Sequence, residues 1–136
     1  MKKNLVFIFL FLSVSFCANA QGENMLLSEP EVLPRFGDGN YSLFKYLNEN
    51  FVFSEEDKAQ HIEGEMVVTF VVDTTGKISN VEIRKGLRPS INQKMKEIIS
   101  QMPPWTPGRA EGRWINSRFS IAMIVESDSA RIKPLF

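Results

Sequence analysis

A β-hairpin signature constrains the fold of this chain more than any other feature: the segment 61–84 reads HIEGEMVVTFVVDTTGKISNVEIR. Between Glu65 and Asp73, apolar residues occupy both faces of the predicted strand, which is typical of a central strand covered on at least one side. Thr74-Thr75-Gly76 then turns the chain, because Gly76 can adopt a positive φ at little steric cost. In the second strand Val81 and Ile83 point to the same face. The segment therefore predicts a hairpin whose first strand lies inside a sheet.

Two short helices are predicted before this hairpin. Asn40 can cap the first helix, in which four apolar residues share one face: Leu43, Phe44, Leu47 and Phe51. The second begins at Ser54 with the S-x-x-D pattern of a capping box, in which Ser54 and Asp57 bond to each other's backbone, and it reaches about Gln60.

A longer helix follows the hairpin. Ser90 and Gln93 predict a capping box at its start, and Pro103-Pro104 ends it. Its apolar stripe has the spacing i, i+4, i+7, i+8 and i+11 and consists of Ile91, Met95, Ile98, Ile99 and Met102. A third strand is predicted from about Arg113 to Val125.

The element order is helix, strand, strand, helix, strand. A right-handed crossover through the longer helix gives the sheet order two–one–three. The predicted fold class is therefore α+β, with a three-stranded antiparallel sheet (α-β-β-α-β) and helices packed on one face. In this arrangement the third strand lies at an edge of the sheet.

The N-terminus predicts an exported protein. Lys2 and Lys3 precede an apolar run, Leu5–Phe16, and Ala18-Asn19-Ala20 is a signal-peptidase pattern. The run is shorter than the ~20 residues that a membrane-spanning helix needs. Cleavage would also remove Cys17, and with it any disulfide or thiolate–metal site. An uncleaved segment would instead associate the chain with a membrane.

The predicted organisation has four parts: residues 1–20 are a signal peptide, 21–35 an extended lead-in, 36–126 the folded domain and 127–136 a loose tail. After removal of Lys2 and Lys3, fourteen basic residues face sixteen acidic ones, so the net charge is near −2. This balance gives no general attraction to nucleic acid or to an anionic membrane.

The residues with catalytic or metal-binding chemistry are few. His61 is the only histidine, and the sequence offers it no positioned partner, so a surface turn explains it better than a catalytic role. Glu55, Glu56 and Asp57 are explained as acids in the first turn of a helix, where the helix dipole favours them. The sequence therefore predicts no enzyme, no cofactor and no metal site.

Four motifs, in their order and spacing, resemble the C-terminal domain of TonB proteins in its Bacteroides-type form. They are Tyr46-Leu47…Asn50-Phe51, Ile62-Glu63-Gly64, Val72-Asp73…Gly76-Lys77-Ile78 and Met102-Pro103-Pro104-Trp105-Thr106-Pro107-Gly108. The resemblance extends from about Pro34 to Val125. It implies a periplasmic, non-enzymatic module that binds the N-terminal box peptide or the plug of TonB-dependent outer-membrane receptors and takes part in transport.

The resemblance also implies where such a partner binds, because the family's box peptide adds as a strand beside the last strand. On this chain that strand is the stretch 113–121, and an edge strand offers unpaired backbone groups for such pairing. The predicted partner-binding residues are Arg113, Trp114, Ile115, Asn116, Ser117, Arg118 and Phe119.

Two departures from the family bear on function. The chain has Phe53-Ser54 where the family usually has Tyr-Pro. The lead-in, residues 21–35, spans at most ~50 Å, which favours docking over force transmission. Two alternatives stay open: the domain pairs with itself as a homodimer, or it competes with a full-length transducer for receptors.

Overall fold

The structure, a computed structural model, describes residues 26–135, so the predicted signal peptide lies outside the described residues. Within them the elements are α1 (Asn40–Asn50), α2 (Glu55–Ala59), β1 (Glu63–Val72), β2 (Ile78–Lys85), α3 (Pro89–Ser100), β3 (Gly108–Ala110), β4 (Arg113–Ile115), β5 (Ser117–Glu126) and β6 (Arg131–Pro134). No helix in this part of the chain combines the length and the apolar character that crossing a membrane requires.

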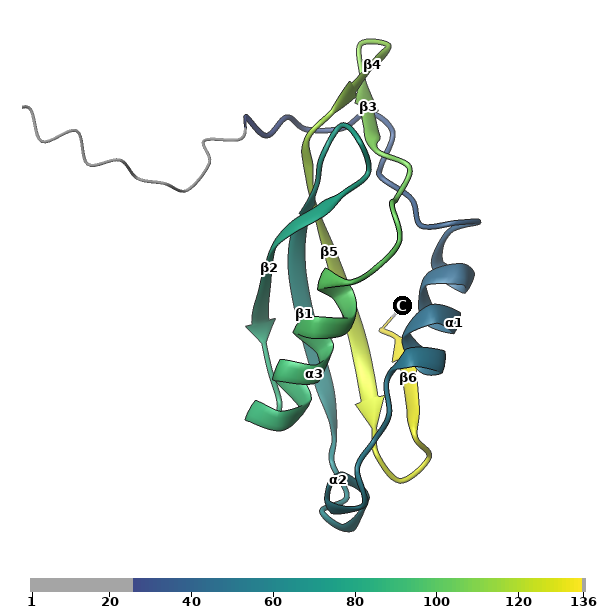
Figure 1. Ribbon diagram of the computed structural model, residues 1–136, viewed down its shortest axis with the longest axis vertical. Coiled ribbons are helices and arrows are strands. Elements are labelled where there is room, and N and C mark those ends of the chain that lie inside the picture. The colour runs from purple at the N-terminus through teal and green to yellow at the C-terminus, as the bar shows by residue number, and fades with distance from the viewer. Residues whose placement is uncertain (1–25, 136) are drawn as a thin grey trace, which may run out of the picture.

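The fold is α+β, as the sequence predicts. An antiparallel sheet has the order β2-β1-β5-β6, and α1 and α3 lie over one of its faces, α3 beside β2 and α1 beside β6 (Figure 1). The central position of β1 is confirmed: it pairs with β2 on one side and, over ten consecutive residues, with β5 on the other. The core between sheet and helices contains every second residue of β1, namely Met66, Val68, Phe70 and Val72.

The prediction of one continuous third strand at the edge of the sheet is wrong. Residues 113–115 form β4, which turns back on β3 through Glu111 and Gly112, both with positive φ. Asn116 separates β4 from β5. Its side-chain oxygen accepts a hydrogen bond from Thr74 N (2.9 Å), and its carbonyl accepts one from Ser28 N (3.1 Å). These bonds hold Asn116 outside both strands. A fourth strand, β6, lies outside β5.

The prediction of a loose tail from Ser127 is also wrong. The Ser127 hydroxyl accepts a hydrogen bond from Ile62 N (2.8 Å), and the chain then reverses at Ala130, which has a φ of 48°. β6 follows and pairs with residues 123–126 of β5. Ile132 is the buried side chain of β6. With one buried apolar residue, β6 lacks the alternation of apolar and polar residues from which a strand is predicted.

The capping predictions have mixed outcomes. The capping box of Ser54 and Asp57 is confirmed in both directions. The other two caps are wrong: Gly39 precedes α1, and Arg88 precedes α3 without a side-chain capping bond. Pro89 begins α3, a position where its missing N–H is not needed. The Ser90 hydroxyl is 3.4 Å from Asp57 Oδ1 and so contributes to a different contact.

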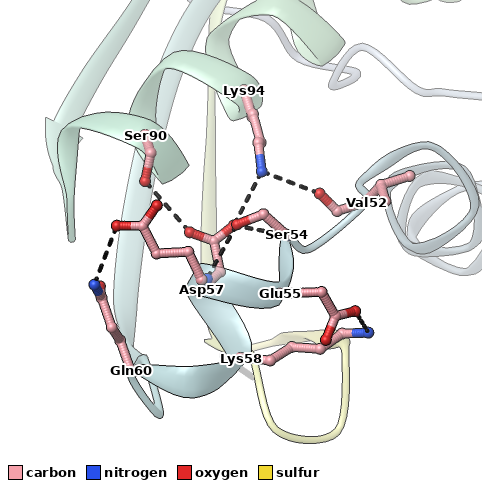
Figure 2. A network of polar contacts seen from close by, with 9 residues as sticks. Val52, Ser54, Glu55, Asp57, Lys58, Gln60, Ser90 and Lys94 are labelled. Carbon is pink, nitrogen blue, oxygen red and sulfur yellow. Dashed lines mark hydrogen bonds and ion pairs between the residues drawn. The ribbon is translucent and has the colours of Figure 1, made fainter.

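That contact joins α2 to α3 around Asp57 (Figure 2). The Asp57 side chain is buried. Lys94 Nζ is 2.9 Å from Asp57 Oδ2 and also donates to the Val52 carbonyl at 3.2 Å. Burial by itself raises the pKa of Asp57, but the hydrogen bonds from Lys94 and Ser54 outweigh burial and lower this pKa from 3.8 to about 2. Asp57 is therefore a cap and an ion-pair partner at once.

We expect Asp57→Asn to lower the free energy of unfolding at pH 7 by about 2 kcal/mol, the equivalent of the change in pKa. Because the native pKa lies below the unfolded value of 3.8, the ionised carboxylate stabilises the fold fully above about pH 5. This contribution is lost as the pH falls toward 2. Urea unfolding between pH 7 and pH 2 measures it. The exposed Glu55, changed to Gln, is the control, and an Asn variant with the pH dependence of the wild type would contradict the assignment.

Gly76 fixes the turn between β1 and β2 against the loop that follows α3. Its φ is 85°, and a Cβ placed on it would collide with the carbonyl oxygen of Trp105. The Trp105 amide donates to the Gly76 carbonyl at 2.8 Å. Trp105 itself is buried and packs edge-on against Phe70 and Phe119. The glycine thus allows the hairpin turn and the Trp105 loop to close on each other.

Gly76→Ala should lower the free energy of unfolding by more than about 2 kcal/mol, because left-handed strain of roughly 1–2 kcal/mol is added to a backbone collision. Gly112→Ala is the matched control, since Gly112 also has a positive φ (73°) but open space around its Cβ position. Gly112→Ala should lower the free energy of unfolding by the left-handed strain alone. Equal losses in urea unfolding of the two variants would show that the collision is relieved without cost.

Candidate functional site

The structure divides the predicted partner-binding residues between two places. Arg113, Trp114 and Ile115 belong to β4 and pair with residues 108–110 of β3. Asn116 lies in the break between strands. The last three, Ser117, Arg118 and Phe119, begin β5 and pair with Val72, Val71 and Phe70 of β1. The seven residues therefore do not form one continuous edge.

The outer side of β5 is partly covered. At one end the Asn116 carbonyl accepts from Ser28 N (3.1 Å), and at the other the Ala122 carbonyl accepts from Leu135 N (3.1 Å). Alternate residues of a strand direct their backbone groups to the same side, and the pairing with β1 is regular throughout β5. Arg118 and Ser120 therefore present their N–H and C=O groups on this outer side, between the two covered ends.

Within residues 26–135, no hydrogen bond reaches these outward groups of Arg118 and Ser120. From Asn116 to Ala122 the strand extends about 20 Å at its usual rise per residue. Unpaired edge groups of this kind are a template for a strand from another chain. The structure thus keeps part of the predicted edge open.

A hollow lies beside the open part of the edge, between α1 and β5. It has a volume of about 330 Å³, and its lining residues come from α1, β5, β6 and the residue after β6: Asn40, Leu43, Phe44, Phe119, Ser120, Ile121, Ala122, Pro134 and Leu135. A second hollow of about 420 Å³ shares Asn40, Phe44 and Pro134 with the first and continues between α1 and β6. Together they form a groove, here called the α1 groove.

The far end of the α1 groove is basic. Lys45, Arg131 and Lys133 line it. Lys133 Nζ bonds to Glu126 Oε1 at 2.6 Å, and this bond, together with one from Ser129, keeps the pKa of Glu126 below its usual value. In the described part of the chain, Lys45 and Arg131 have no such ion pair. The groove therefore combines apolar walls with uncompensated positive charge at one end.

Asn48 of α1 covers the outer edge of β6. Its side-chain Nδ2 donates to the Ile132 carbonyl, and its Oδ1 accepts from Ile132 N, both at 2.8 Å. Ile132 lies between Arg131 and Lys133, and its N–H and C=O face away from β5. The Asn48 side chain thus satisfies both of these backbone groups. Asn48 was not predicted to have this role, and the only signal for it in the sequence is a polar residue beside the apolar stripe of this helix.

His61 lies just before β1, at the end of the sheet where the chain turns from β5 into β6. It is exposed, with a φ of 50°, so its interpretation as a surface turn residue is confirmed. Its Nδ1 is 2.7 Å from Asp128 Oδ1. The pair ties the start of β1 to the turn before β6. Among residues 26–135, no serine or threonine hydroxyl is hydrogen-bonded to this imidazole.

The family comparison covers most of the fold just described. A family model for the Gram-negative bacterial TonB protein C-terminal matches residues 49–124, which is more than half of the 136 residues. The match begins at the end of α1 and stops in β5, so β6 lies outside it. No curated protein matches the chain.

We expect Asn48→Ala to loosen β6, because both backbone groups of Ile132 lose their partner, at a cost of about 1–3 kcal/mol. Amide hydrogen exchange at Leu135, which bonds to Ala122 rather than to Asn48, should accelerate at least about fivefold. Asn50→Ala is the control, since the Asn50 side chain bonds only within its own helix, to the Tyr46 carbonyl. Unchanged exchange at Leu135 would show that β6 is held without Asn48.

Proposed function

The chain belongs to the Gram-negative bacterial TonB C-terminal family, and from this premise we propose that it is a non-enzymatic protein-interaction module in outer-membrane transport. In this proposal it is exported to the periplasm and binds the box peptide or plug of TonB-dependent receptors. The partner adds as a strand to the outer edge of β5. The observation that carries the proposal is that the outward backbone groups of Arg118 and Ser120, beside the α1 groove, are unpaired within residues 26–135.

An incoming strand would gain affinity from the main chain and selectivity from its side chains. Its backbone would bond to the outward N–H and C=O groups of Arg118 and Ser120. Side chains on the helix side would enter the hollow next to Phe44 and Phe119. Those on the other face would lie beside the exposed side chain of Arg118. The open stretch accommodates a short segment, with room for about five residues.

The other edge of the sheet, β2, is less suited to strand addition. Exposed charged residues line β2, with Arg84 paired to Glu82 (3.0 Å) and Lys85 paired to Glu65 (3.2 Å). The register between β1 and β2 also shifts twice along their length. Charged side chains and irregular pairing are common means of preventing association at an edge. β5 lacks such irregularity, which supports it as the docking strand.

The alternative function is self-pairing. Two copies can place their open β5 edges side by side about a two-fold axis, which satisfies the same backbone groups without a receptor. In a further alternative, the unpaired domain competes with a full-length transducer for receptors. The docking and self-pairing hypotheses involve the same edge of β5 but different partners, a receptor segment or a second copy of the chain. Measurements on the purified protein therefore separate them.

We expect Ser120→Pro to weaken binding of a receptor box peptide at least tenfold, because proline removes an outward N–H and blocks the approaching strand. The fold should persist, since this N–H has no partner in the described structure. Ser120→Ala keeps the N–H and is the matched control, with affinity close to that of the wild type. Calorimetric titration with peptides from receptors of the same bacterium measures the effect. Equal affinities of the proline and alanine variants would contradict strand addition at β5.

Self-pairing predicts a concentration-dependent dimer in light scattering, and Ser120→Pro should shift it to monomer. If the wild-type protein is monomeric at all concentrations while it binds box peptides, the self-pairing alternative is wrong.

A further inference from the structure

A second exposed apolar surface lies at the β3–β4 hairpin, which projects from one end of the sheet beside the lead-in (Figure 1). Seven large apolar side chains are exposed among residues 26–135, and five of them belong to the lead-in or the hairpin: Leu26, Leu27, Val32, Leu33 and Trp114. Trp114 is 50% exposed and Leu33 63%. A cluster of this kind is typical of an interaction surface.

Two isolated bridges fix the lead-in to β3 and to the loop before it, so this surface is preformed. Val32 N donates to the Arg109 carbonyl (3.0 Å), and Arg109 N donates back to the Val32 carbonyl (2.9 Å). Arg35 and Thr106 exchange a second pair of backbone bonds, at 2.9 and 2.8 Å. Gly108 allows this close approach, because a Cβ there would crowd Pro30 and the Val32 carbonyl.

A hollow of about 250 Å³ opens on this surface, here called the hairpin hollow. As far as the described residues line it, its walls are mostly apolar, with two guanidinium groups and no acidic residue, and include Val32, Leu33, Arg35, Pro107, Arg109 and Trp114. The Arg109 guanidinium carbon is 4.8 Å from the centre of the Trp114 ring, a cation–π contact that holds both side chains in place.

Neither Arg35 nor Arg109 forms an ion pair with any carboxylate in the part of the chain that the structure describes. Arginine presents a planar set of donors that matches a carboxylate, and bonds between the two groups are charge-assisted. The charge that complements the hairpin hollow is therefore negative, next to an apolar group that contacts Trp114 and Leu33.

The surroundings favour a narrow partner over a flat anionic one. Trp114 also lines a second hollow of about 410 Å³, whose lining includes three acidic residues, Glu29, Glu31 and Glu111, against one basic residue, Arg113. A membrane or nucleic-acid surface that extended from Arg35 and Arg109 across Trp114 to this second hollow would meet a net negative charge. A narrow segment confined to the arginine side meets no such repulsion.

We propose that the hairpin hollow is a second docking site, which binds a peptide segment of a partner protein carrying a carboxylate side chain next to an apolar one. The carboxylate bonds to Arg35 and Arg109, and the apolar side chain packs against Trp114. This site is separate from the β5 edge, so the protein can hold two segments at once.

Selection from a phage-displayed random heptapeptide library on the immobilised protein tests this proposal. Peptides with Asp or Glu adjacent to an aliphatic or aromatic residue should be enriched on the wild type. On the double variant Arg35→Gln/Arg109→Gln this enrichment should fall at least about tenfold, the loss expected for charge-assisted hydrogen bonds. Both side chains are exposed, so the fold should tolerate the change.

Lys45→Gln/Arg131→Gln removes the same charge from the α1 groove and should retain the enrichment. Ser120→Pro should retain it as well, so failure of the β5 proposal and failure of this one are distinguishable. Equal enrichment on wild type and the Arg35/Arg109 variant, or no acidic enrichment at all, would overturn the proposal. Sedimentation with phosphatidylglycerol vesicles that depends on the two arginines would also overturn it, in favour of a lipid surface.

Discussion

The ten-residue antiparallel pairing of β1 with β5 is the contact on which the rest of the structure depends. It joins segments about 50 residues apart in the chain and runs without a register shift from Glu63·Glu126 to Val72·Ser117. Regular pairing fixes which backbone groups of β5 face β1 and which face outward. It also directs alternate side chains of both strands into the core under α1 and α3. The location of the open edge, where we propose that a partner docks, follows from this register.

Within residues 26–135, most of the sheet edge is protected and one short stretch is open. β6 covers the C-terminal half of β5, Asn48 covers β6, and charged pairs accompany β2. Since unprotected edges promote aggregation, an open stretch next to an apolar groove is consistent with a binding function. The surface at the β3–β4 hairpin differs from the β5 edge in the groups that it presents to a partner. It presents arginine and tryptophan side chains, whereas the β5 edge presents backbone groups.

Local patterns predicted the local elements well. The hairpin of β1 and β2, the positive φ of Gly76, the capping box of Ser54 and the apolar stripe of α3 all depend on residues close together in sequence. The family resemblance, carried by short motifs in a fixed order, is also confirmed. Steric limits and hydrophobic periodicity determine the local elements, and both follow from residues that are neighbours in the sequence.

The sequence by itself thus determined the α+β class, the central position of β1 and the helix faces that form the core. Tertiary structure alone decided which edge is open. β6 has one buried side chain and no readable period, and Asn116 ends a strand only because Thr74 and Ser28 are near it in space. Likewise, Arg35 and Arg109 lie in one hollow only because the lead-in pairs with β3. Such contacts join residues tens of positions apart, where the free energy depends on the whole packed fold and not on any local pattern.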